Sequence, residues 1–250
     1  MPHDTLYMMS LPGEAPLSPA PNRIPVRLSY RVSPELRLLR LPGPPLRSAV
    51  MAVTCGEESP HGDPAPLCRT ILREYAARGA RGLLLDFDHP SPDLDHLAGL
   101  LSRHGLPLIL PEWLADRAPN CRVLISSALS GGSLEVRLSE AVKTYGADRV
   151  ILALERCAEE FPLPCPSGCG RPLSPEELER LTAAHRPHFH FSSALCTRYF
   201  VHCREDRAHL VLWDDDDTLR EKHACARRCG VYRFSLLQRD KSALFTSFSP

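Results

Sequence analysis

Two carboxylates end an apolar run in the first third of the chain. Asp86 and Asp88 complete the segment Arg81-Gly-Leu-Leu-Leu-Asp-Phe-Asp88. In an extended strand, side chains two residues apart point to the same face, so these two acids are expected to project together. At the carboxyl end of a parallel barrel strand, both side chains would project into the opening where active sites lie. Asp86 and Asp88 are therefore the residues that we expect at a catalytic site. In the alternative interpretation, Asp88-His89-Pro90-Ser91 only turns the chain and caps the next helix.

Two further acids follow apolar runs that read as strands. Glu112 follows 106–111, and Glu155 follows 150–154. At the carboxyl ends of parallel barrel strands, such residues would join the first pair in an acidic, substrate-binding opening. Ordinary solvation at a strand end, or pairing with Arg156 or Arg81, is the alternative interpretation.

Short apolar runs alternate with amphipathic helices along most of the chain. Alternation of this kind predicts parallel strands joined by crossover helices. About eight strands in 250 residues fit a (β/α)₈ barrel; a doubly wound open sheet is the alternative. The expected strands are 26–30, 49–54, 82–87, 106–110, 122–126, 149–153, 210–213 and 231–236, and the expected helices are 67–77, 92–103, 134–145, 175–184 and 218–228.

The domain organisation follows from the same pattern. Residues 1–24 are rich in proline and predict an arm lying over the domain. Residues 25–250 predict a single TIM-like barrel domain. The barrel is expected to be degenerate, because 106–126 leaves little room for a helix and the segment near 194–213 predicts an inserted antiparallel hairpin.

Composition excludes several classes of protein. The chain has 30 basic and 30 acidic residues, which argues against a nucleic-acid binder. It has no apolar run of the roughly 18 residues that a membrane span requires. The first residues lack the basic and apolar regions of a secretory signal, so the ten cysteines predict reduced thiols and a cytoplasmic protein.

No metal or cofactor site is assigned from the sequence. Cys165 with Cys169, and Cys225 with Cys229, are spaced as thiol pairs, but nothing arranges four ligands around either pair. The run 214–217 is acidic, lacks the pattern of a calcium loop, and is expected to cap the following helix. No glycine motif for binding phosphate is present.

Three segments in the same order resemble family 18 glycoside hydrolases, especially spore-germination-type members. The strand-four motif of that family, D-x-x-D-x-D-x-E, corresponds to Arg81, Leu84, Asp86 and Asp88. Residues 145–155 resemble the family's seventh strand with its lead-in. The segment 199–237 resembles the tail, in which a hairpin with an acidic "W-x-E-D" run precedes a helix and the last barrel strand.

The resemblance implies roles for individual residues. Asp88 takes the position of the general acid, which is Glu in the family, and Asp86 that of the aspartate orienting the substrate acetamido group. The two deeper acids are replaced by Arg81 and Leu84. The family's sixth-strand tyrosine–aspartate pair is absent from 125–130. Phe234 corresponds to the tryptophan of the last strand, and Trp213 to the tryptophan of the acidic run.

Two functions follow. The favoured one is a family 18-like barrel that has lost or weakened catalysis and serves as a glycan-interacting or assembly protein, linked to bacterial sporulation by resemblance. The alternative is an active glycosidase that cleaves N-acetylglucosamine-containing glycans by substrate assistance. A glycan ligand would need aromatic stacking partners, for which the candidates are Trp113, Trp213, Tyr199 and Phe234.

Overall fold

The computed structural model describes residues 3–243 except 16, 18–19, 44–45, 47, 57, 167 and 186. The chain divides into two compact units. The first comprises 1–125, 145–153 and 232–240, and the second 126–144, 154–231 and 241–250.

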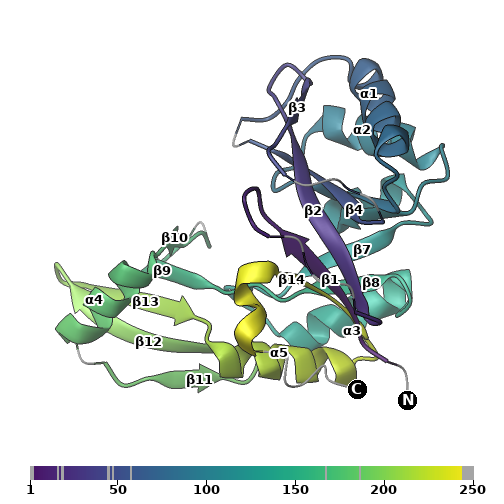
Figure 1. The fold of residues 1–250 in the computed structure, drawn as a ribbon. Helices are drawn as coiled ribbons and strands as arrows, with labels where there is room; N and C mark the ends of the chain where they lie inside the picture. Colours follow the sequence, from purple (N-terminus) through teal and green to yellow (C-terminus); the bar gives the residue numbers. More distant parts are fainter. Residues whose placement is uncertain are drawn as a thin grey trace. The chain divides into compact units, whose positions relative to one another are not determined.

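The first unit is a closed barrel of parallel strands (Figure 1). The ring order is β1–β14–β8–β7–β6–β5–β4–β2, and β1 also pairs with β2, which closes it. This confirms the predicted TIM-like barrel. A short strand, β3 (Leu38–Arg40), pairs with β2 outside the ring. The ring strands are β1 (Thr5–Ser10), β2 (Arg23–Val32), β4 (Val50–Cys55), β5 (Gly82–Asp86), β6 (Leu108–Pro111), β7 (Arg122–Ser126), β8 (Val150–Ala153) and β14 (Arg233–Leu237).

The closing strand β1 lies in the segment that the sequence assigns to a proline-rich arm. That assignment is wrong for residues 5–10, since β1 pairs in parallel with both β14 and β2. The flanking prolines hide a run in which Leu6 through Ser10 are all buried, as in strands covered on both faces. The expected strand at 210–213 lies instead in the second unit. With β1 counted, β5 is the fourth strand of the ring in chain order.

The inside of the ring is an apolar cluster to which every ring strand contributes. Because side chains alternate along a strand, members of this cluster identify the inward positions of each strand. They are Tyr7 and Met9, Ile24, Val26 and Leu28, Val50 and Ala52, Leu84, Ile109, Leu124, Ile151 and Leu237.

Two helices flank the ring within the first unit, α1 (Pro64–Ala77) and α2 (Pro92–Ser102). Asp63 caps α1 by accepting a hydrogen bond from the Ala65 N–H at 2.9 Å. Ser91 stands at the corresponding position of α2, but its hydroxyl donates to the Pro60 carbonyl at 3.3 Å instead of capping the helix. Between β6 and β7 the structure has only the 3₁₀ helix η1 (Glu112–Arg117), as the short interval predicts.

The second unit contains an antiparallel sheet of order β10–β9–β13–β12–β11. The predicted hairpin is formed by β12 and β13, joined by a two-residue turn at Glu205 and Asp206, with φ of 51° and 58°. None of the helices among the described residues is long and apolar enough to cross a membrane. The elements are β9 (Ala158–Leu163), β10 (Arg171–Pro172), β11 (His190–Ser192), β12 (Thr197–Arg204), β13 (Arg207–Trp213), α3 (Leu134–Tyr145), α4 (Pro175–His185) and α5 (Asp216–Arg228). The 3₁₀ helix η2 (Gln238–Ala243) follows β14 and begins in the first unit.

A buried ion pair organises the start of α5. Lys222, 1% exposed, donates to Asp214 at 2.5 Å. The Asp214 carboxylate also accepts from the Cys157 N–H at 2.7 Å and the Thr197 hydroxyl at 2.8 Å. The helix cap is Asp215, which forms a capping box with Thr218. Within the acidic run 214–217, Asp215 therefore caps α5, as expected, whereas Asp214 is the buried counter-ion of Lys222.

Replacing Met8 with alanine tests whether β1 belongs to the barrel. Met8 is fully buried, so the Met8→Ala variant should lose about 2–5 kcal/mol of unfolding free energy in urea. Leu39→Ala, at a 48% exposed position on β3, is the matched control and should change stability by at most about 0.5 kcal/mol. Equal stability of the two variants would show that residues 5–10 lie loosely on the surface.

Candidate functional site

The two predicted catalytic acids lie at the carboxyl end of the fourth ring strand. Asp86 is the last residue of β5, two residues after Leu84, which packs inside the barrel. The half-buried Asp86 side chain therefore stands on the inward face, opposite Thr54 of β4. Asp88 follows in a bend after the strand and is exposed. The two acids share one end of the barrel but differ in their contact with water.

The buried thiol of Cys55 interacts electrostatically with both carboxylates. Burial raises the pKa of Cys55, the last residue of β4, and the negative charges of Asp88 and Asp86 raise it further, against a lowering by the Asp88 backbone N–H. Because Thr54 pairs with Asp86, Cys55 and the segment 86–88 lie at the same end of two neighbouring strands. Three polar side chains thus gather at the ends of two neighbouring strands.

The next strand along the ring adds an acid and an aromatic ring. The half-buried Glu112 and Trp113 follow β6 directly, at the start of η1. The Trp113 indole N–H donates to the Phe87 carbonyl at 3.3 Å. Since Phe87 stands between Asp86 and Asp88 in the sequence, this bond ties the indole to the segment that carries both acids. The structure therefore brings Glu112 to the same end of the barrel as the predicted pair.

The two positions that hold deeper acids in the resembling family have no carboxylate here. Leu84 is 2% exposed within the apolar interior. Arg81 precedes β5 and lies at the opposite end of the barrel, where it lines a cavity of about 200 Å³ with Tyr7 and Arg122. The inward-facing side chain next to Asp86 on β5 is therefore the hydrocarbon of Leu84.

Phe234, predicted to contact substrate, is closed to a ligand in this structure. Its side chain is 0% exposed. Leu237, three residues later on β14, packs inside the ring, so alternation places Phe234 on the outward face of the strand. The sequence identifies the strand correctly but does not show on which face this residue lies.

The remaining two predicted binding residues belong to the second unit. Glu155 is exposed, accepts a hydrogen bond from the Ser126 hydroxyl, and its N–H donates to the Ser127 hydroxyl at 3.1 Å. Trp213 packs edge-on against Phe189 and Phe200, with ring centroids 5.0 and 5.4 Å away. The predicted set is thus divided between the two units.

One cluster that the sequence analysis missed has the composition of a metal site. Glu160, His202 and His209 bring their ligand atoms within 4.8 Å of one another, and they are the one such group of three among the described residues. The hairpin itself contains a signal, because a turn at 205–206 pairs His202 directly with His209. Glu160 lies on a polar strand that the sequence pattern does not predict.

No protein-family model and no curated protein matches the sequence. Solved structures share its fold. A chitinase from Chromobacterium violaceum is 14% identical with a TM-score of 0.66, and a chitinase from Rhizomucor miehei is 12% identical with a TM-score of 0.64; each alignment covers 98% of both chains. The Bacillus megaterium spore cortex-lytic enzyme SleL is 13% identical with a TM-score of 0.60, over 94% of this chain and 71% of that one. The predicted resemblance to chitinase-like barrels is confirmed in the fold.

The reactivity of Cys55 tests whether the acids gather at this end of the barrel. Removing a negative charge with Asp88→Asn should lower the Cys55 pKa, because the thiolate is then less disfavoured. Its alkylation rate at pH 8, followed by mass spectrometry, should therefore rise. Asp206→Asn, in the exposed hairpin turn, should leave the rate unchanged. An unaltered rate in Asp88→Asn would contradict the arrangement.

Proposed function

We propose that this chain is a glycan-binding barrel of glycosidase-like architecture that has lost or weakened catalysis. Its ligand would be an N-acetylglucosamine-containing glycan, bound at the carboxyl ends of the ring strands, where TIM-barrel sites lie. A role in assembly during bacterial sporulation is part of the proposal, and spore cortex-lytic SleL is among its structural neighbours. We also propose a cytoplasmic location, supported by ten cysteines that are all free thiols.

The observation that carries the proposal is the position of Asp86. It ends the fourth ring strand on the inward face and is half-buried. The resemblance gives this carboxylate the task of orienting an acetamido group, which it would do by accepting the acetamido N–H. Trp113 and Glu112 at the end of the next strand would add a stacking surface and a hydroxyl acceptor.

The residues at and around Asp86 support the proposal of weakened catalysis. A general acid must reach the glycosidic oxygen, yet Asp88 is exposed and about 1.5 Å shorter than glutamate. A misplacement near 1 Å can cost about a hundredfold in rate. In addition, Leu84 stands in the interior where the family has an acid, and β7 ends at Ser126 without the family's tyrosine. An active glycosidase with Asp88 as its acid is the alternative.

Binding is tested by calorimetry with a linear N-acetylglucosamine tetramer. The unmodified protein should bind it, and Asp86→Ala and Trp113→Ala should each weaken the affinity by about tenfold, which corresponds to loss of about 1.4 kcal/mol. Asp206→Asn in the hairpin turn serves as the control with unchanged affinity. No heat of binding from the unmodified protein would refute the glycan-binding proposal.

Turnover is tested with a chromogenic chitobioside. We expect no hydrolysis by the unmodified protein and at most a trace from Asp88→Glu, because one added methylene restores reach but not the sixth-strand tyrosine. Asp88→Asn should be inactive. Strong hydrolysis by the unmodified protein that disappears in Asp88→Asn would establish the enzyme instead.

A further inference from the structure

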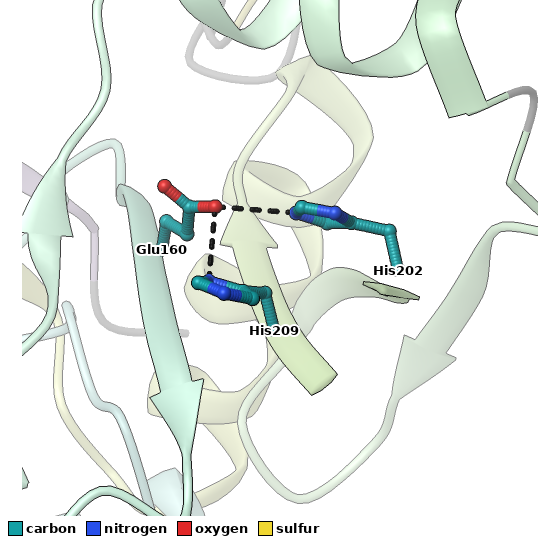
Figure 2. Close-up of side chains that lie close together, drawn as sticks. All are labelled: Glu160, His202 and His209. Carbon is teal, nitrogen blue, oxygen red and sulfur yellow. Dashed lines mark hydrogen bonds and ion pairs between the residues drawn. The ribbon is translucent and has the colours of Figure 1, made fainter. Parts of the chain in front are cut away.

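Three metal-binding side chains converge between the strands of the antiparallel sheet. Glu160 comes from β9, His202 from β12 and His209 from β13. Figure 2 shows one carboxylate oxygen of Glu160 facing both imidazoles. Residues from three adjacent strands thus meet at one point.

The register of the sheet explains the convergence. His202 pairs directly with His209, so their side chains stand on the same face. Glu160 pairs with Val211, two residues after His209, and therefore shares that face. The helix α4 covers it, since Leu178 and Leu181 pack against Phe200 and Val211.

The distances suit a small cation. Glu160 Oε1 lies 3.2 Å from His202 Nε2 and 3.2 Å from His209 Nδ1. Ligands bound tetrahedrally to zinc at 2.0–2.1 Å lie about 3.3 Å apart. Small side-chain rotations would therefore bring the three atoms into coordination geometry.

Because the three side chains are buried, their polar atoms are expected to destabilise the fold when no ligand is bound. The side chains of His202, Glu160 and His209 are 1%, 3% and 9% exposed. His209 Nδ1 is close to the carboxylate, yet it makes no hydrogen bond of acceptable geometry and is shielded from water. A buried polar atom left in this way destabilises the fold, and a metal–nitrogen bond would satisfy it.

The other carboxylate oxygen is already oriented. Arg171, directly opposite Glu160 in the sheet, donates to Oε2 at 2.9 Å and to Glu177 at 2.7 Å. This bond turns Oε1 toward the histidines, as outer partners of metal ligands do. Glu177 offsets the charge of Arg171, while the half-exposed Arg204 lies 3.8 Å from Oε1 and can swing into solvent.

We propose that Glu160, His202 and His209 bind one divalent transition-metal ion, with Zn²⁺ as the best match to two imidazoles and a carboxylate. Water would take the fourth position. The ion would tie together β9, β12 and β13, and His185 of α4, stacked on His202 at 4.4 Å, would shield one side. This site is independent of the proposed glycan site.

The test is metal stoichiometry on the full chain after removal of metal with a chelator. Zn²⁺ is titrated against a chromophoric chelator, and Co²⁺ serves as a spectroscopic probe. We expect one Zn²⁺ per chain, a Co²⁺ spectrum without thiolate bands, and at least about a tenfold loss of affinity in His209→Gln and in His202→Gln.

Matched controls separate this site from other ligands. His190→Gln, at an exposed histidine of β11 in the same sheet, and Cys165→Ser should keep the affinity of the unmodified protein. Circular dichroism checks that each variant folds, and the unmodified protein decides the question if one does not. Less than a tenth of an equivalent bound by the unmodified protein, a Co²⁺ spectrum dominated by thiolate bands, or equal affinity in folded His209→Gln would overturn the proposal.

Discussion

Closure of the ring by β1 is the constraint on which the barrel depends. This six-residue strand pairs in parallel with β14 on one side and β2 on the other. Without it, the other seven ring strands would form an open sheet with two edges, and edges expose unpaired backbone groups. Closure also encloses the apolar interior and makes the Asp86 strand the fourth of the ring.

The ring in turn determines what Asp86 and Asp88 can do. Alternation directs Asp86 inward at the carboxyl end of β5, so its carboxylate borders the hydrocarbon side chains of Leu84 and Ala52 below it. Asp88, beyond the strand, lies in water. This asymmetry is the reason why we propose recognition of an acetamido group by Asp86 and weakened proton transfer by Asp88. In the second unit, by contrast, two carboxylates are buried: Asp214 pairs with Lys222, and Glu160 lies beside His202.

The sequence predicts much of this structure because periodicity reports burial. Seven ring strands, the flanking helices and the β12–β13 hairpin follow from apolar spacing. β1 does not, because its short run lies among prolines, and 210–213 resembles a ring strand because its central residues are buried as fully as those of a barrel strand. The face occupied by Phe234 depends on register, which a continuous apolar strand leaves open. The cluster at Glu160 is not predicted from the sequence, because His202 and His209 lie more than forty residues further along the chain.

A crystal structure after prolonged soaking with an N-acetylglucosamine tetramer would test the proposed site. It should contain an intact sugar at the carboxyl ends of the ring strands, with an acetamido group on Asp86 and a ring against Trp113. A cleaved sugar at this position would contradict the loss of catalysis. A sugar bound elsewhere, away from Asp86, would contradict the proposed site itself.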